Sequence, residues 1–302
     1  MQTRDLNDQN GRNDRIAVRA AALASWCEKV AESATGAAIE LDRVTKRFVS
    51  PTGKSFTALR DLDLTVAAGE FVAVVGPTGC GKSTTLALIS GLEPPSLGTI
   101  RVFGEPVKSV GRSVGYVFQR DAVFPWKNVL ENVAMGPRFR GADNEEANTQ
   151  AREWIARVGL AGFERYYPHQ LSGGMRKRVA LAQTLINQPR ILLMDEPFSA
   201  LDVQTRALME NELLELWAST GASVVFVTHD LEEAIGLADR VVVITAGPGT
   251  VKGTYRVDLP RPRNIAEVRF QPRFIEIYEE VWKDLRDEVL VSYERSKHLV
   301  AS

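Results

Sequence analysis

The sequence predicts an α/β fold with a mostly parallel sheet, and three stretches carry this prediction. Residues 70–76, EFVAVVG, form an apolar, β-branched run of the kind that is buried on both faces of a parallel sheet. A glycine-rich loop and a helical pattern follow it directly. Residues 190–197, RILLMDEP, and 222–228, ASVVFVT, are similar runs, so further buried strands are expected beside the first.

Composition narrows the class of protein. The chain has 302 residues, enough for about two domains. Its 37 Lys and Arg against 38 Asp and Glu leave a net charge of −1, so nothing in it indicates nucleic-acid binding. Its two cysteines, Cys27 and Cys80, provide no disulfide framework, which favours a reducing cytosol. No apolar run approaches the roughly 18–20 residues that span a bilayer, so a protein of this kind would act at a membrane only through a partner.

Residues 1–37 differ from the rest and are expected to form an N-terminal extension, partly disordered with a short helix. Its apolar residues recur at steps of four and three, which predicts a narrow stripe on that helix. These residues are Ile16, Ala20, Leu23, Cys27 and Val30. We expect the helix to dock on its own domain or to fray, rather than to bind a specific partner.

Residues 75–85, VGPTGCGKSTT, place a phosphate-binding motif between the first strand and its helix. Gly76, Gly81, Lys82 and Ser83 fit G-x-x-x-x-G-K-[ST], a loop whose backbone N–H groups hold nucleotide phosphates. Strand, loop and helix follow one another as the motif requires, which makes a chance match the weaker alternative. The residues expected to bind nucleotide here are Gly76, Pro77, Thr78, Gly79, Cys80, Gly81, Lys82, Ser83 and Thr84.

The helix after this loop determines where the phosphates lie. Its unpaired N–H groups and its dipole favour negative charge at its start. Lys82 would reach the β- and γ-phosphates, and the Ser83 hydroxyl would bind Mg²⁺. Leu86, Ile89 and Leu92 recur at helical spacing, and the prolines that follow are expected to end the helix.

Polar side chains at the ends of other strands add catalytic candidates. Asp195 is placed to hold Mg²⁺, and Glu196 is placed to polarise an attacking water as general base. The alternative is a pair of acidic residues on the surface, which the apolar strand before them disfavours. Gln119 follows the run SVGYVF, and His229 follows ASVVFVT. We expect His229 to contact the γ-phosphate. The expected metal ligands are Ser83, Gln119 and Asp195, and the expected catalytic residues are Lys82, Gln119, Glu196 and His229.

Residues 171–189, LSGGMRKRVALAQTLINQP, resemble the signature sequence of ATP-binding cassette ATPases and the helix after it. The chain also has, in the family's order, an aromatic residue before the phosphate loop (Phe48), the Gln119 loop, SALD at 199–202 and His229. These motifs cover about residues 38–245. The resemblance implies a P-loop NTPase core with a RecA-like, mostly parallel sheet, an N-terminal antiparallel β subdomain and an α-helical signature subdomain.

The resemblance also implies the domain organisation. The ATPase domain is expected over residues 38–270, with its helical subdomain at about 121–172, and a C-terminal amphipathic helix and tail over 271–302. The periodic apolar residues of the helical subdomain are Trp154, Ile155, Val158 and Leu160. The C-terminal helix is expected to pack on the core through Phe274, Ile277, Val281, Trp282, Leu285 and Val289.

In cassette ATPases two copies pair head to tail, and each signature covers the nucleotide that the other copy holds. The resemblance therefore implies that Ser172, Gly173 and Gly174 bind the partner copy's ATP, and that Asp202 also contacts nucleotide. ATP, bound with Mg²⁺, would join the two copies, and its hydrolysis would let them separate.

Two residues depart from the family's usual pattern. Met175 stands where the signature commonly has Gln, but the phosphate-facing Ser and glycines are intact, so activity is expected. Phe48 stands where tyrosine commonly stacks on adenine, and it keeps the ring face while losing the hydroxyl. A plain core aromatic is the alternative for Phe48.

The segment after Gln119 suggests a membrane partner. Phe124, Pro125 and Trp126 would form an apolar wall for a short helix of a membrane-spanning permease, or they pack the helical subdomain itself; these alternatives are evenly balanced. The segments DAVFPWKNVLENVAMG, VVITAGPGTV and DLPRPR resemble the importer ATPases for nitrate, alkanesulfonates and taurine, although an importer of a pyrimidine precursor would look similar.

The expected protein is therefore the energy-coupling ATPase of an importer, working as a homodimer under permease subunits, with a separate solute-binding protein, at the cytoplasmic face of the cell membrane. A soluble cassette ATPase of translation, DNA repair or cluster assembly is disfavoured by the single cassette and the neutral charge. A nonhydrolytic nucleotide sensor conflicts with the presence of Glu196 and His229. The solute would contact the permease and the binding protein, so this chain leaves its identity open.

Overall fold

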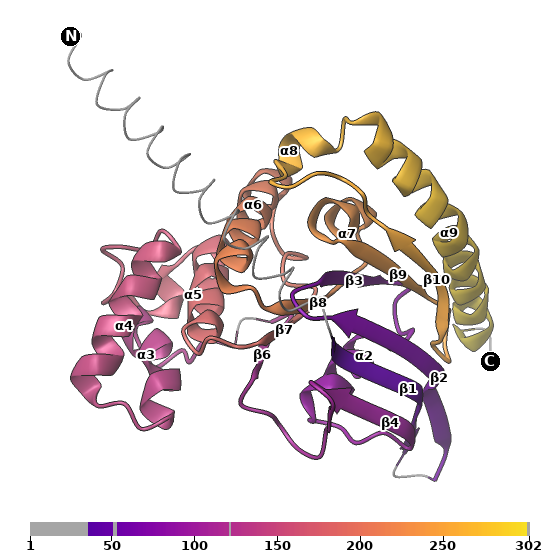
Figure 1. Cartoon of the computed structure of the whole chain (residues 1–302), viewed down its shortest axis with the longest axis horizontal. Helices are drawn as coiled ribbons and strands as arrows, with labels where there is room; N and C mark the ends of the chain where they lie inside the picture. Colours follow the sequence, from indigo (N-terminus) through magenta and orange to yellow (C-terminus); the bar gives the residue numbers. More distant parts are fainter. Residues whose placement is uncertain (1–35, 51–52, 121, 301–302) are drawn as a thin grey trace.

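The computed structural model describes residues 36–50, 53–120 and 122–300, and it contains two sheets flanked by helices (Figure 1). The larger sheet has six strands in the order β10-β9-β3-β8-β7-β6. All neighbours in it are parallel except β10 and β9, which are antiparallel. Its strands are β3 (Phe71–Val75), β6 (Val114–Val117), β7 (Ile191–Asp195), β8 (Ser223–Thr228), β9 (Arg240–Ile244) and β10 (Val251–Arg256). The predicted mostly parallel sheet is confirmed.

The central strands of this sheet are buried from end to end. Every residue of β3, β7 and β8 is buried, as their unbroken apolar sequences predict for strands covered on both faces. The ring of Phe71 on β3 packs edge-on against Trp217 of α6, with 5.2 Å between the ring centroids. Because the strands are parallel, the polar residues that follow them meet at one edge of the sheet.

The smaller sheet is antiparallel, with the order β2-β1-β4-β5. Its strands are β1 (Ala37–Val49), β2 (Ser55–Ala67), β4 (Leu97–Val102) and β5 (Glu105–Pro106). Leu41 and Leu62 on this sheet share a core cluster with Val72 of β3 and Leu86 of α2. The N-terminal antiparallel sheet that the resemblance implied is therefore present, and it packs beside the helix that starts at the phosphate loop.

Three helices form a separate group at the left of Figure 1: α3 (Val129–Phe139), α4 (Asn144–Arg157) and α5 (Gly173–Leu185). A 3₁₀ turn at Pro168–Gln170 precedes α5. Asn128 starts α3 with a capping box to Glu131, and Asp143 caps α4 by accepting hydrogen bonds from two backbone N–H groups. The periodic apolar residues predicted to hold this group together are all buried: Trp154, Ile155, Val158 and Leu160.

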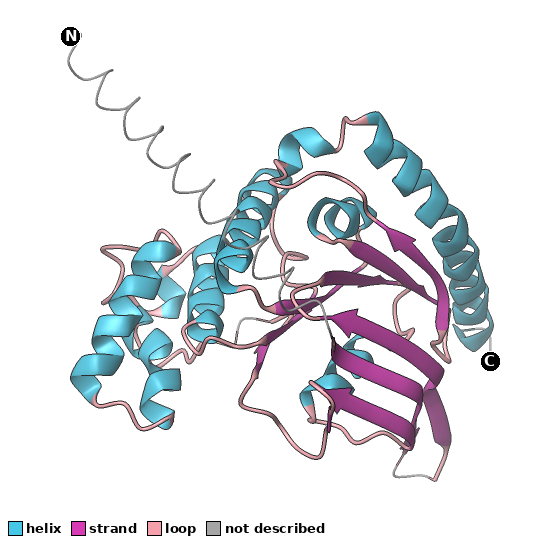
Figure 2. Ribbon diagram, in the orientation of Figure 1, coloured by secondary structure: helices cyan, strands magenta, loops and turns pink. Residues whose placement is uncertain are grey.

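The remaining helices are α2 (Lys82–Ser90), α6 (Val203–Thr220), α7 (Leu231–Leu237), α8 (Ile265–Val268) and α9 (Pro272–Val300). In Figure 2, α9 runs along the outer side of the larger sheet. Helix α2 ends earlier than predicted, because Gly91 adopts a left-handed conformation that closes the helix. Leu92 is consequently outside the helix and 53% exposed.

The predicted core-facing stripe of α9 is right for four residues and wrong for two. Phe274, Ile277, Val281 and Leu285 are buried. Trp282 is 42% exposed, because it directly follows Val281 and a helix turns about 100° per residue, so both cannot face the core. Val289 is 40% exposed, one turn beyond the last buried position.

Among the described residues, no helix has the length and apolar character needed to cross a bilayer. The predicted N-terminal helix lies outside the described residues. Of the predicted extension over residues 1–37, only Gly36 and Ala37 are described, and Ala37 is the first residue of β1.

Candidate active site

The phosphate loop lies between β3 and α2, and it is packed against protein on one side only. Gly81 has φ 104°, and a Cβ there would lie 2.5 Å from Leu59 Cδ2, so glycine is required. Gly76 is equally confined, since a Cβ would lie 2.8 Å from the Sγ of Cys80. By contrast, a Cβ at Gly79 would meet nothing within 4 Å. The loop therefore has a tight base and an open side, which fits a cradle that receives phosphates.

Lys82 places its charge at this loop. The residue opens α2 and is only 6% exposed. Its ammonium donates hydrogen bonds to the carbonyl oxygens of Gly76, at 2.8 Å, and Pro77, at 3.0 Å. A buried cation at the start of a helix adds to the positive end of the helix dipole, so this corner of the molecule favours a polyanion.

Ser83 and Asp195 form an oxygen pair beside the loop. The Ser83 hydroxyl donates to Oδ1 of Asp195 at 3.0 Å. Burial raises the pKa of Asp195, and the hydrogen bond from Ser83 opposes that rise. A hydroxyl and a carboxylate oxygen are the kind of ligand that Mg²⁺ takes in nucleotide sites, so the residues present fit this ion.

Glu196 is held between two other predicted residues. Its Oε2 accepts a hydrogen bond from Gln119 Nε2 at 3.3 Å and lies 3.0 Å from His229 Nδ1. Gln119 follows β6, Glu196 follows β7 and His229 follows β8. Because these strands pair in parallel, their carboxyl ends lie side by side. Glu196 also has φ 42°, and its N–H donates to Val227 O at 2.9 Å. Left-handed backbone at a non-glycine residue costs energy and is concentrated at functional sites.

The signature residues lie at the start of another helix. Ser172 caps α5 by accepting from the N–H of Met175 at 3.3 Å, and Gly173 is the first helical residue. A Cβ at Gly174 would lie 3.1 Å from Thr205 Cγ2, at the start of α6. Asp202 caps α6 by accepting from the N–H of Thr205 at 3.0 Å. The predicted residues at the starts of α5 and α6 are therefore neighbours.

This second group is spatially distinct from the phosphate loop. Helix α5 packs on α3, α4 and β6, whereas α2 packs on β2, β4, β7 and β8. Figure 1 accordingly shows α5 and α2 in different parts of the molecule. The structure thus unites Lys82, Ser83, Gln119, Asp195, Glu196 and His229 at one edge of the sheet and places residues 172–174 and Asp202 elsewhere.

Phe48 lies near the end of β1, opposite Phe56 of β2. Its side chain is 38% exposed, and the ammonium of Lys46 lies 4.9 Å from the centre of its ring. The same strand β2 continues to Leu59, which contacts the base of the phosphate loop. An exposed ring in this position is able to stack on a flat aromatic group, and a plain core aromatic would be buried.

Two supporting residues were missed by the sequence analysis. Tyr116 on β6 hydrogen-bonds to Asp195, and burial, followed by the charge of Asp195, raises the pKa of its phenol, so the hydroxyl remains a donor. Lys177 on α5 is 3% exposed and donates to the backbone carbonyls of Phe118, at 3.4 Å, and Gln119, at 3.2 Å. Strand and helix patterns predict which face a residue occupies but not its partner across the fold, so neither contact could be predicted.

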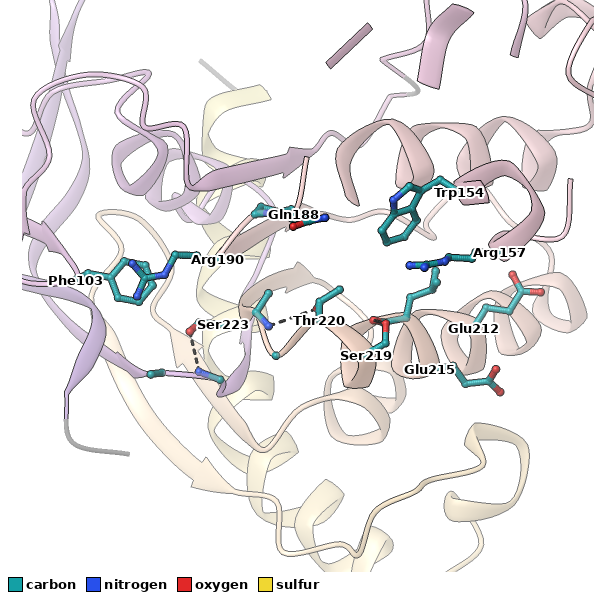
Figure 3. Close-up of a pocket in the computed structure, with 16 residues that line it drawn as sticks. Phe103, Trp154, Arg157, Gln188, Arg190, Glu212, Glu215, Ser219, Thr220 and Ser223 are labelled. Carbon is teal, nitrogen blue, oxygen red and sulfur yellow. Dashed lines mark hydrogen bonds between the residues drawn. The ribbon is translucent and has the colours of Figure 1, made fainter. Parts of the chain in front are cut away.

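A groove of about 990 Å³ lies at the opposite, amino-terminal edge of the larger sheet (Figure 3). Arg190 precedes β7 there, and its guanidinium stacks on Phe103 with 3.7 Å to the ring centre. Ser223, the first residue of β8, also lines it. None of the predicted nucleotide-binding residues borders this groove, so it is separate from the candidate active site.

The class of protein follows from the carboxyl edge of the sheet. P-loop nucleotide hydrolases have a phosphate loop and, beside it, a serine paired with an aspartate at a strand end. They also have a polar residue next to that aspartate. The chain has this arrangement and is a nucleotide hydrolase of that class. Residues 59–199 match the family described as ABC transporter. An uncharacterized ABC transporter ATP-binding protein of Methanocaldococcus jannaschii is 45% identical over 84% of this chain and 93% of its own length. The chain belongs to the ABC transporter family, as one of its ATP-binding proteins.

Other relatives have named functions. The nitrate import ATP-binding protein NrtD of Synechocystis is 40% identical over 82% of this chain and 95% of its own length. The taurine import ATP-binding protein TauB of Burkholderia pseudomallei is 42% identical over 74% of this chain and 88% of its own length. A dimeric ATP-binding cassette solved in a post-hydrolysis state with ADP and Pi is 33% identical, with a TM-score of 0.66 over 74% of this chain and 100% of the solved chain. The predicted family, its fold and its ATPase activity are confirmed.

Proposed function

We propose that this chain is the ATP-hydrolysing, energy-coupling subunit of an importer for a small anion such as nitrate, an alkanesulfonate or taurine. The observation that carries the catalytic part is the convergence of Gln119 and His229 on one oxygen of Glu196, beside the Ser83–Asp195 pair. The named functions of the nitrate and taurine import relatives support the transport part. An importer for another small solute, such as a pyrimidine precursor, is the alternative.

Each residue at this edge has a proposed role in hydrolysis. The N–H groups of residues 76–84 and the Lys82 ammonium bind the phosphates of ATP. Glu196 accepts the proton of the attacking water as general base, and Gln119 and His229 hold its carboxylate toward the γ-phosphate. Ser83, Asp195 and Gln119 would hold Mg²⁺, which supplies charge neutralisation on the phosphate oxygens when bound. Phe48 would stack on adenine.

The site also needs a second copy of the chain. Ser172, Gly173 and Gly174 form a helix start with free N–H groups, an anion-binding arrangement that lies apart from the chain's own phosphate loop. Two copies arranged head to tail would place this helix start, and Asp202 beside it, over the nucleotide of the other copy. The dimeric state of the solved cassettes supports this assembly.

The exposed loop after Gln119 is the proposed contact with the permease. Trp126 is 70% exposed, and its ring packs against Phe124 with 5.5 Å between centroids. An exposed, rigid aromatic pair is typical of residues that anchor protein interfaces, which favours the permease contact over packing of the helical group. A solute-binding protein would act indirectly through the permease, and the subunit would lie at the cytoplasmic face of the inner membrane.

The test is Glu196→Gln, which keeps the shape of the side chain and removes its basicity. We expect hydrolysis to fall by roughly 10²- to 10⁴-fold, the usual contribution of a general base, while ATP binding and an ATP-dependent dimer persist. Glu279→Gln, an exposed acid on α9, is the matched control. Unchanged turnover in Glu196→Gln would remove Glu196 from its role.

The transport assignment has its own test. Coexpression with its cognate permease subunits should move the chain to the membrane fraction. Trp126→Ala should reduce that association while leaving the ATPase rate of the isolated chain intact. Sedimentation with ribosomes or DNA instead would favour a cassette ATPase outside transport.

A further inference from the structure

Arg206 lies at the centre of an ion cluster behind His229. It belongs to the first turns of α6, and its side chain is 25% exposed. One guanidinium nitrogen, Nη1, donates to Oδ2 of Asp230 at 3.0 Å, and Nε lies 3.5 Å from Oε1 of Glu233. The other, Nη2, donates to the backbone carbonyl of Leu201 at 3.2 Å. One side chain therefore contacts both the helix after His229 and the loop that precedes α6.

Both chain neighbours of His229 are fixed by this cluster. Asp230 follows His229 and caps α7 by accepting from the N–H groups of Glu232 and Glu233. Thr228 precedes His229, and its hydroxyl donates to Oε2 of Glu233 at 2.6 Å. The His229 side chain itself is 59% exposed, so packing holds it weakly. Apart from its contact with Oε2 of Glu196 at 3.0 Å, its position depends on the two flanking residues, and hence on Asp230 and Glu233, the carboxylates that face Arg206.

The other contact of Arg206 reaches the segment that the second copy would approach. Leu201 directly precedes Asp202, the cap of α6, and Asp202 lies beside the signature helix start through Thr205 and Gly174. A displacement of this segment would therefore act on the guanidinium that also holds the His229 loop.

The acidic side chains around Arg206 favour a planar guanidinium, which can donate to two groups, at this position. Glu210, one turn further along α6, is 3% exposed and faces the same cavity, whose volume is about 340 Å³. Asp230, Glu232, Glu233 and Arg269 also line the cavity. Burial, and then the charges of Glu233 and Asp230, raise the pKa of Glu210 to about 8, opposed by Arg206 and Arg269. Burial raises the pKa of Glu233 as well. The carboxylates within 3.5 Å of the Arg206 guanidinium are those of Asp230 and Glu233.

We propose, building on the function proposed above, that Arg206 is a positioning residue for ATP hydrolysis: it links the Leu201–Asp202 segment to the His229 loop, so that docking of the second copy sets the position of His229. The guanidinium donates hydrogen bonds to Asp230 and to the Leu201 carbonyl while its Nε lies 3.5 Å from Oε1 of Glu233, an arrangement that the single ammonium of a lysine cannot reproduce. Arg206 touches neither the phosphate loop nor Glu196, so it acts on turnover and leaves nucleotide binding alone.

The test compares Arg206→Lys with Arg269→Ala. Arg269 lines the same cavity and pairs with the same helix, through Glu232 at 3.2 Å, but it contacts neither Asp230 nor Leu201. We expect Arg206→Lys to lower kcat at least tenfold with KM for ATP within twofold, and Arg269→Ala to keep both within twofold. An ATP-dependent dimer should still form in the Glu196→Gln background carrying Arg206→Lys. A normal kcat in Arg206→Lys, or an equal loss in both variants, would overturn the proposal.

A second variant keeps the proposal testable if Arg206→Lys does not fold. Glu233→Gln retains an oxygen that accepts from Thr228 and removes the charge that faces Arg206, and it should give a smaller fall in kcat, again without a change in KM. An unchanged kcat in Glu233→Gln together with an unfolded Arg206→Lys would also reject the proposal. Failure of the catalytic assignment looks different: His229→Ala would then hydrolyse ATP at the normal rate, whatever Arg206 does.

Discussion

The hydroxyl of Ser83 donates a hydrogen bond to Oδ1 of Asp195 over 3.0 Å, joining the start of α2 to the end of β7. The two residues are 112 positions apart in the sequence. They meet because β3, β8 and β7 are parallel neighbours, which align the residues that follow each strand. The pair therefore links the phosphate loop to the carboxyl edge of the larger sheet, and its oxygens suit a hard divalent cation.

Asp195→Asn should separate nucleotide binding from its dependence on Mg²⁺. The amide keeps the size of the carboxylate and removes its charge, so we expect the Mg²⁺ concentration for half-maximal ATPase activity to rise by roughly 10- to 100-fold. ATP affinity measured with EDTA present should stay within about threefold, because Lys82 and the loop are unchanged. Asp258→Asn, an acid paired with Arg273 on the surface, serves as the control. A Mg²⁺ titration identical to wild type would contradict the assignment.

Two glycines of the phosphate loop provide a matched comparison. Gly79 and Gly81 both have positive φ, 78° and 104°, but only Gly81 lacks space, since its Cβ would meet Leu59 at 2.5 Å. Gly79→Ala should cost roughly 1–2 kcal/mol of folding free energy from backbone strain alone. Gly81→Ala should cost about 1–3 kcal/mol more, because Leu59 must also move. Urea denaturation of both variants measures the difference. Equal losses of folding free energy would show that the Leu59 side chain moves aside at no cost.

The sequence predicted the parts of this site that are local and periodic. The strands before Gly76, Asp195 and His229 are unbroken apolar runs, and the loop spacing is defined by glycine geometry, so their positions followed from pattern alone. Contacts between distant segments did not follow. Lys177 is one basic residue in a stretch of three, and only the packed structure shows that it is the one buried against the Gln119 loop.

Helix ends and helix faces were predicted less well, for reasons visible at single residues. Gly91 closes α2 before Leu92, although the apolar spacing alone would continue the helix to the prolines. Trp282 satisfies an apolar pattern yet lies on the exposed side, since adjacent Val281 already occupies the core position. Periodicity identifies an apolar stripe but does not fix its edges.

Asn132 should be critical for the loop that carries Trp126. It is fully buried on α3; its Oδ1 accepts from the N–H of Phe124 at 2.8 Å, and its Nδ2 donates to the carbonyls of Phe124, Lys127 and Asn128. Removing the amide takes the side-chain partner from two part-buried backbone groups, the N–H of Phe124 and the carbonyl of Lys127, so Asn132→Ala should lose about 1–3 kcal/mol of stability.

Protease cleavage near residues 122–128 and urea denaturation together check the Asn132 prediction. Faster cleavage in Asn132→Ala is expected, because the loop loses the side chain that anchors it. Asn148→Ala on α4 removes a single hydrogen bond from Arg138 and should leave the loop protected. Comparable cleavage rates in both variants would show that Asn132 does not hold the loop.

Glu210 should make folding stability depend on pH, and the sign follows from its environment. Its pKa is raised from an ordinary 4.5 to about 8, chiefly by burial. Between these two values the folded chain holds a proton that the unfolded chain releases, so the free energy of unfolding falls as pH rises through this window. The maximum slope from one such group is about 1.4 kcal/mol for each pH unit. Glu210→Gln carries no titrating proton and should lose this dependence.

The difference in unfolding free energy between Glu210→Gln and wild type reports the titration of Glu210 together with its coupling to Glu233, whose charge raises the pKa of Glu210. Glu233, whose pKa burial also raises, and Asp195 titrate in both proteins and affect both curves in the same direction. The variant should therefore gain stability over wild type steadily from about pH 5 to pH 8, and the gain should level off above that range. Urea denaturation at intervals across this range measures it, with Glu279→Gln as the exposed control. Parallel curves for Glu210→Gln and wild type would mean that Glu210 is ionised in the folded chain, which would place a third negative charge, beside those of Asp230 and Glu233, near Arg206.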